Sequence, residues 1–141
     1  MGRSIQTEFE IGHGLSIALT EAGTWLVRAD VREFPLEQID DFYRAWLLLE
    51  RPFTDVRDAL DQIARNANAA TPFPFVKLIG SAMKAKSGEW TDRAMAWVPF
   101  LATAEKVTLK GLFADVRDSR WASQKTRQLA RKYVNEIERS A

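Results

Sequence analysis

The sequence predicts an α+β, mostly α fold: a short N-terminal antiparallel β-meander over residues 1–33, then about six helices over residues 34–141, arranged as stacked helical hairpins. Two observations lead to this prediction. Apolar residues alternate with a period of two as far as Val31, which is typical of half-buried strands, and from Pro35 onward they recur at three- and four-residue steps, which is typical of amphipathic helices. Because the chain has 141 residues, of which 46% are hydrophobic, we expect a single domain with one core.

Three strands are expected in the first 33 residues, because turns that contain glycine interrupt the alternation twice. The first interruption is Gly12-His13-Gly14, and the second is Thr20-Glu21-Ala22-Gly23. A helix over residues 15–31 is the alternative, since several of the same apolar residues also fall at three- and four-residue steps. A glycine inside that helix would cost about 1 kcal/mol, so we favour strands that pack on the helices through Trp25 and Val27.

The first predicted helix runs from Pro35, which suits an initial helical turn, to Pro52, which ends it. On a wheel of 3.6 residues per turn, one face collects the apolar residues Leu36, Ile39, Phe42, Tyr43, Trp46 and Leu47. Trp46 is therefore expected in the core. Thr54 is the predicted N-cap of a second helix. Its inward-facing residues are Val56, Leu60, Ile63 and Ala67.

Four more helices are expected after the Pro-rich turn at residues 71–74. The third covers residues 75–86. The fourth has Thr91 as its N-cap and is kinked or ended one turn early by Pro99. The fifth covers about residues 108–117, and the sixth about residues 119–138.

These helices form three candidate hairpins, which start near residues 36, 75 and 108. A spacing of about 30 to 40 residues is typical of stacked helical repeats. One internal similarity supports repetition: Phe53-Thr-Asp-Val-Arg-Asp58 and Phe113-Ala-Asp-Val-Arg-Asp118 differ only at their second residue.

The composition excludes several kinds of active site. The chain has no cysteine, so disulfides, thiolate metal sites and a cysteine nucleophile are ruled out. His13 is its only histidine, which rules out a metal site built mainly on imidazoles, and between two glycines it is expected in a turn rather than as a catalytic base. No phosphate-binding glycine loop, calcium loop or nucleophile elbow is present. We therefore expect no catalytic residues, no cofactor and no metal.

An enzyme that uses carboxylates alone is the remaining catalytic alternative. Asp55, Asp58 and Asp61 are spaced by three along the second helix, as a hard-cation site could require. Arg57 and Arg65 are interleaved with them, so an ion-paired solvent face is the favoured interpretation. The sequence thus favours a non-enzymatic protein.

We expect a cytoplasmic protein with no membrane partner. The first residues lack the apolar segment of a secretory signal. The longest uninterrupted apolar run is Ala45 to Leu49, far short of the roughly 20 residues that cross a bilayer.

The last predicted helix carries the strongest candidate for binding. Residues 103–141 contain 9 Lys+Arg against 5 Asp+Glu, whereas the rest of the chain is net acidic. The predicted stripe opposite the apolar face of this helix consists of Arg120, Gln124, Arg127 and Arg131, and it is flanked by Lys125, Lys132 and Trp121. Such a stripe could bind an acidic protein surface, or the phosphates and bases of a nucleic acid. A solvated amphipathic helix, with Trp121 packed on the preceding helix, is the alternative.

Trp90 is a further binding candidate, because it lies at a helix junction and fits no predicted inner face. A hydrophobic staple at the start of the fourth helix would also explain it. Taken together, these features favour a protein-binding module of the adaptor, immunity-type inhibitor or assembly-chaperone class. The alternative is a nucleic-acid-binding domain that uses the basic face of the C-terminal helix.

Overall fold

A computed structural model describes residues 8–67 and 71–140 of the chain. Backbone contacts divide the chain into two compact units, and the boundary along the sequence falls between Pro74 and Phe75. In the residues that the structure describes, the first unit contains strands and two helical segments, and the second unit contains helices and no strands. The predicted class, α+β and mostly α, is confirmed. The first unit ends at Pro74, well beyond residue 33. The hydrophobic period of the sequence changes near residue 33, within this unit.

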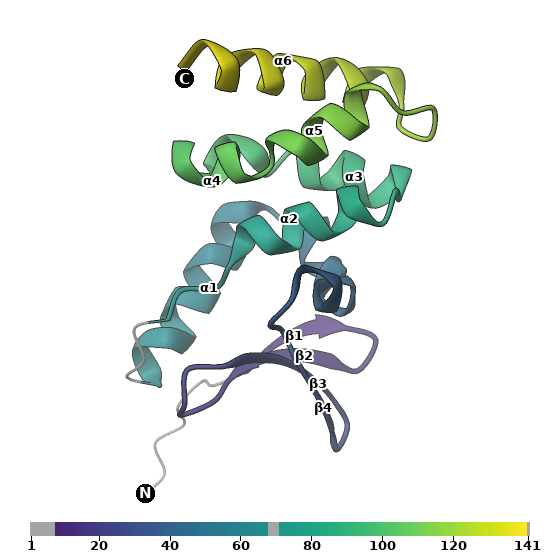
Figure 1. The fold of residues 1–141 in the computed structure, drawn as a ribbon. Coiled ribbons are helices and arrows are strands. Elements are labelled where there is room, and N and C mark those ends of the chain that lie inside the picture. The colour runs from purple at the N-terminus through teal and green to yellow at the C-terminus, as the bar shows by residue number, and fades with distance from the viewer. Residues whose placement is uncertain (1–7, 68–70, 141) are drawn as a thin grey trace, which may run out of the picture. The chain divides into compact units, whose positions relative to one another are not determined.

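The first unit contains an antiparallel sheet of four strands in the order β1-β2-β3-β4 (Figure 1). The strands are β1 (Glu8–Gly12), β2 (Leu15–Leu19), β3 (Trp25–Ala29) and β4 (Arg32–Pro35). The first three are the predicted meander, so the helical alternative for residues 15–31 is wrong. The fourth strand was not predicted. It pairs with β3 through a hairpin in which Asp30 takes a φ of 58°.

His13 lies in the turn between β1 and β2, as predicted from its two glycine neighbours. Gly12, His13 and Gly14 have φ values of 105°, 54° and 75°. Residues with a side chain rarely adopt such positive φ values, whereas glycine adopts them without steric cost. The two glycines that flank His13 therefore favour this turn.

One row of the core of the first unit crosses a single face of the sheet, and the opposite face also buries Ala18 and Leu26. Phe9, Ile17, Val27 and Phe34 occupy matching register positions on the four strands. The two central residues, Ile17 and Val27, are fully buried. Two helical segments cover this sheet: η1 (Ile39–Glu50) packs on β1, and α1 (Phe53–Asn66) packs on β1 and β2.

The segment η1 is a 3₁₀ helix, not the predicted α-helix, and this changes which residues are buried. Phe42, Ala45 and Leu48 are all 0% exposed, whereas Tyr43 is 48% exposed and Trp46 is only partly buried. A 3₁₀ helix has three residues per turn, so side chains three apart share one face. The prediction that Trp46 lies in the core is therefore wrong.

The helix α1 starts two residues earlier than predicted, because its N-cap is not Thr54. Pro52 is the N-cap, and Thr54 is an exposed residue of the first turn. The predicted inward face is confirmed for Val56, Leu60 and Ile63, which are buried. Ala67 is the C-cap of the helix and is only partly buried.

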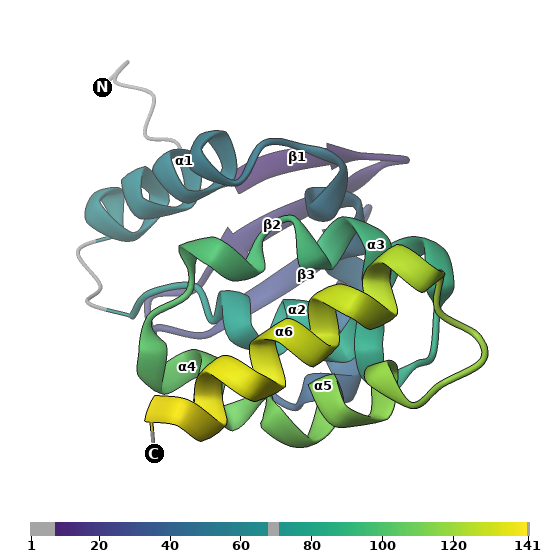
Figure 2. The same ribbon diagram turned by 90° about the horizontal axis from the view of Figure 1, so that it is seen from above.

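The second unit contains five α-helices and a short 3₁₀ helix within its described residues. They are α2 (Phe75–Lys84), α3 (Gly88–Met95), η2 (Val98–Phe100), α4 (Thr103–Thr108), α5 (Lys110–Arg117) and α6 (Gln124–Ser140). Within this unit α5 packs between α6 and α2, and Figure 2 shows the first turns of α6 beside α3. The pairs α2–α3 and α5–α6 correspond to the hairpins predicted near residues 75 and 108.

The junction between α2 and α3 differs from its prediction in one detail. Ser87, not Thr91, is the N-cap of α3, and its Oγ accepts a hydrogen bond of 3.3 Å from the N–H of Trp90. Thr91 is fully buried, and its Oγ1 donates to the carbonyl oxygen of Ala82. The α-helix ends at Met95, before Pro99.

The two similar segments are not a structural repeat. In both, the Phe and Val side chains are buried and the following Arg pairs with its neighbouring Asp: Arg57 with Asp58 at 3.2 Å, and Arg117 with Asp118 at 2.8 Å. The first segment begins α1, however, and the second ends α5. A shared amphipathic pattern accounts for the similarity.

Among the described residues, no helix combines the length and the apolar character that a bilayer span needs.

Candidate functional site

The predicted basic stripe is divided between a loop and a helix. The last helix, α6, begins at Gln124, so Arg120 and Trp121 lie in the loop before it, and the wheel that aligned Arg120 with Gln124 does not apply. Two serines determine this boundary. Ser119 Oγ donates to the carbonyl oxygen of Val116 at the end of α5, and Ser123 Oγ accepts the N–H of Thr126 at the start of α6.

The apolar face of α6 is buried, as expected for the side opposite the predicted stripe. Its buried residues include Thr126, Ala130, Tyr133 and Ile137. The predicted binding residues Gln124, Lys125, Arg131 and Lys132 are all exposed on this helix.

Arg127 does not behave like the rest of the stripe. Its side chain is partly buried, and Nη1 donates a hydrogen bond of 2.7 Å to the carbonyl oxygen of Ala122. This bond ties the α5–α6 loop to the first turn of α6. Arg127 is therefore engaged within the protein, unlike the exposed residues of the predicted stripe.

Trp121 borders a depression in the second unit with a volume of about 450 Å³. The residues lining it come from the C-terminal end of α2 and its following turn, from α5, and from the loop after α5. They are Met83, Lys84, Lys86, Leu112, Asp115, Asp118, Ser119 and Trp121. We call this the Trp121 depression. Its apolar members are the buried Met83 and the partly buried Leu112 and Trp121.

Close packing of the backbone holds the Trp121 loop in place. A Cβ atom at Gly88, the first residue of α3, would lie 3.1 Å from the carbonyl oxygen of Trp121. The same loop is tied to α3 by Asp92, whose Oδ1 accepts from Ser123 Oγ at 3.2 Å and from Thr126 Oγ1 at 2.5 Å. Trp121 is therefore positioned by a packed loop.

Charges of both signs line the Trp121 depression. Lys84 and Lys86 come from the α2 side, and Asp115 and Asp118 from the α5 side. Hydrogen bonds from Arg117, at 2.8 and 3.0 Å, hold the pKa of Asp118 below its usual range, and the positive charges of Arg117 and Arg131 lower it further. Asp118 is consequently a fixed negative charge at neutral pH.

Trp90 lies outside the depression. It is a partly buried residue of α3, and the guanidinium of Arg93 lies 4.7 Å from the centre of its ring. Arg93 also pairs with Glu89 at 2.9 Å. The structure thus brings together Trp121 and the ends of α2 and α5, and it does not place Trp90 with them.

Sequence reasoning identified Trp121 but missed Lys84, Lys86 and Asp115. These residues come from two different helices and their flanks, so no pattern within one helix connects them. A tryptophan without an inner face was the only local signal.

Within residues 8–67 and 71–140, no group of three or more His, Asp or Glu side chains is placed to hold a metal ion. Comparison with protein-family models, with curated protein sequences and with solved structures finds no match for this chain.

Proposed function

We propose that this chain is a cytoplasmic, non-enzymatic protein-binding module of the adaptor, inhibitor or assembly-chaperone class, and that the Trp121 depression is its binding surface. The observation that carries this proposal is a partly exposed tryptophan that lines one depression together with apolar side chains, lysines and aspartates. Tryptophan is enriched among residues that dominate binding energy, and such residues lie in apolar pockets with polar rims.

The mixed charge favours a protein over a nucleic acid at this surface. Asp115 and Asp118 would repel phosphates, and they offset the attraction of Lys84 and Lys86. A protein partner can match charges of both signs, which contributes to specificity.

Nucleic-acid binding is the second candidate, and the outer face of α6 supports it. Lys125, Arg131 and Lys132 are exposed there with Gln124. Arg127, however, is engaged by Ala122, which reduces the cationic groups available for phosphates.

Trp121→Ala is the direct test, and Trp90→Ala is its matched control because Trp90 is also partly buried in the same unit but lies outside the depression. The full chain serves as bait at physiological salt. We expect wild type and Trp90→Ala to retain the same partner protein, and Trp121→Ala to bind it at least about 30-fold more weakly, as for a loss of 2 kcal/mol or more.

Asp115→Lys tests the rim without removing an apolar contact. It should change the association rate and the salt dependence of the same complex. Equal capture by all variants would refute the Trp121 depression as the binding surface. Binding of generic RNA or DNA that falls steeply with salt, with no protein retained at physiological salt, would favour the nucleic-acid alternative.

A further inference from the structure

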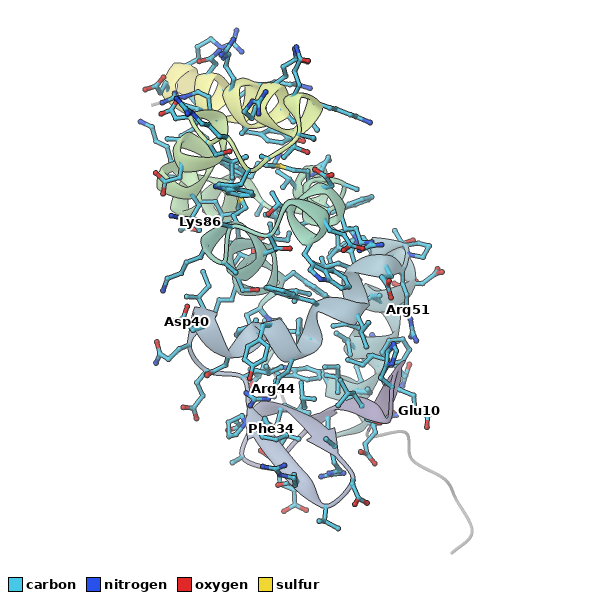
Figure 3. The ribbon with its side chains drawn as sticks, turned by 90° about the vertical axis from the view of Figure 1, so that its right-hand side faces the viewer. Glu10, Phe34, Asp40, Arg44, Arg51 and Lys86 are labelled. Carbon is cyan, nitrogen blue, oxygen red and sulfur yellow. The ribbon has the colours of Figure 1, made fainter. Side chains whose placement is uncertain are left out.

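Two arginines cap the ends of the buried row on the sheet of the first unit. The row begins and ends with the partly buried aromatics Phe9 and Phe34. The guanidinium of Arg51 lies 4.8 Å from the ring centre of Phe9, and that of Arg44 lies 3.9 Å from the ring centre of Phe34. Figure 3 shows Arg44, from the middle of η1, beside Phe34, and Arg51 at the C-cap of η1.

Arg44 contacts more than one aromatic ring. It also lies 4.6 Å from the ring centre of Tyr43, so two aromatic rings hold it. Within the described part of the chain, no carboxylate lies at ion-pair distance from Arg44 or from Arg32, whose guanidinium is 5.5 Å from the Phe34 ring centre. Both cations contact aromatic rings.

Neighbouring acidic residues are already engaged elsewhere. Glu33 accepts from Arg28 at 2.7 Å, and Asp41 accepts the backbone N–H groups of Glu37 and Gln38 at 3.1 and 2.8 Å. This contrast matters because arginine presents planar donors that match a carboxylate in two parallel hydrogen bonds. Stacking on a ring orients those donors in advance and reduces the entropy lost on binding.

Apolar surface is exposed beside these cations. Tyr43 is 48% exposed, and Val31, at the tip of the β3–β4 hairpin, is 88% exposed. Tyrosine and arginine are among the residues most often found to dominate binding energy.

The free edge of β4 is a poor site for adding another strand. The strand has four residues and ends in Pro35, which has no N–H to donate. A partner would therefore be recognised by side chains on the face, and not by an extended backbone ladder.

We propose that Arg32, Phe34, Tyr43 and Arg44 form a second binding surface, which takes a peptide segment of a protein partner in which one Asp or Glu carboxylate stands next to an apolar side chain. The carboxylate accepts hydrogen bonds from Arg44, and the apolar side chain packs against Tyr43. This surface lies in the first unit, so it does not depend on the function proposed for the Trp121 depression. We call it the Arg44 surface.

Local charge favours a single carboxylate over a polyanion. Residues 32–44 contain two arginines and four acidic residues, Glu33, Glu37, Asp40 and Asp41. A strand of phosphates would approach these carboxylates along with the arginines. A single carboxylate brings less negative charge to these acidic side chains than a strand of phosphates does.

The test uses the full chain labelled with ¹⁵N and a blocked pentapeptide, Gly-Leu-Glu-Leu-Gly, at millimolar concentration. We expect saturable NMR shifts confined to β4, the β3–β4 hairpin and the middle of η1. The same peptide with Gln in place of Glu should bind at least about tenfold more weakly, because a neutral amide loses the charge-assisted hydrogen bonds. Inorganic phosphate and oligo-dT are titrated in parallel.

Arg44→Lys keeps the positive charge and removes the planar donors, and it should weaken peptide binding by about tenfold or more. Arg51→Lys is the matched control, since it alters the equivalent stacking on Phe9 and should leave peptide binding unchanged. A merely structural Arg44 would give equal binding by wild type and Arg44→Lys. That result, equal binding of the Glu and Gln peptides, absence of shifts at millimolar peptide, or tighter binding of oligo-dT would each overturn the proposal.

Discussion

The ring of Trp25 meets the ring of Phe73 edge to face, with 5.3 Å between their centres. Trp25 Nε1 also donates a hydrogen bond of 3.2 Å to the carbonyl oxygen of Thr71. Trp25 is buried on β3. The ring of Phe73 also contacts the ring of Phe42 in η1, with 6.0 Å between their centres. The tryptophan therefore links the sheet, η1 and the segment after α1 within the first unit.

Replacing Trp25 with Ala should lower the free energy of unfolding by about 3 to 5 kcal/mol, because it removes a buried aromatic ring and leaves a cavity. Trp25→Phe keeps a ring opposite Phe73 but loses the bond to Thr71, so its cost should be clearly smaller. Urea unfolding of both variants measures the difference. Equal losses would show that ring packing contributes little here.

Phe42→Ala and Trp46→Ala distinguish the 3₁₀ arrangement of η1 from an α-helix. Phe42 is fully buried and Trp46 is partly exposed. Phe42→Ala should therefore cost about 3 to 5 kcal/mol, and Trp46→Ala distinctly less, although tryptophan is the larger residue. Thermal and urea unfolding provide the comparison. A larger loss for Trp46→Ala would contradict the burial pattern of η1.

Much of the sheet could be predicted because apolar residues alternate along the sequence of the first three strands, and turns that contain glycine separate these strands. Burial itself does not alternate, since residues 17–19 and 25–27 are all buried. The strand β4 could not be predicted, because Phe34 is the only large apolar residue among its four and it alone lies on the core face. In η1, apolar residues occur at spacings that suit both three and 3.6 residues per turn. The backbone hydrogen bonds decide between the two kinds of helix, and the side-chain pattern does not reveal them. They determine whether Ala45 or Trp46 lies on the buried face with Phe42.

The candidate site could be predicted only in part, for a similar reason. Ser119 and Ser123 are both suitable N-cap residues, so the sequence allows α6 to begin at either. The contact between Ser123 and Asp92, which are distant in sequence, favours the later start. That choice moves Trp121 from a helix face into a loop, where it meets residues of α2 and α5. Predicting the depression would have required these long-range contacts.

Arg127 and Arg131 should differ in their effects on stability, although both belong to the predicted stripe. Arg127→Gln removes a charged donor from the carbonyl oxygen of Ala122 and should cost about 1 to 2 kcal/mol. Arg131→Gln, at an exposed position, should change the free energy of unfolding by less than about 0.5 kcal/mol. Chemical denaturation of both variants tests this. Equal values would show that Arg127 does not anchor the loop.

Tyr133 should make the protein less stable at alkaline pH. Burial raises the pKa of Tyr133 above its ordinary value of 10.0, and the negative charge of Glu136 raises it further. Below the ordinary pKa the phenol is neutral in both the folded and the unfolded state. Above it the unfolded chain loses this proton before the native state does, so the free energy of unfolding falls as pH rises.

Tyr133→Phe removes this contribution and keeps the ring that lies 5.3 Å from Phe113. Between about pH 9 and pH 11, its free energy of unfolding should therefore decline less than that of the wild type. Tyr43→Phe, at an exposed position, is the matched control and should retain the wild-type decline. Urea unfolding at each pH measures the three slopes. If Tyr133→Phe and wild type lose stability equally, the alkaline loss originates from other groups, and the buried phenol does not couple folding to pH.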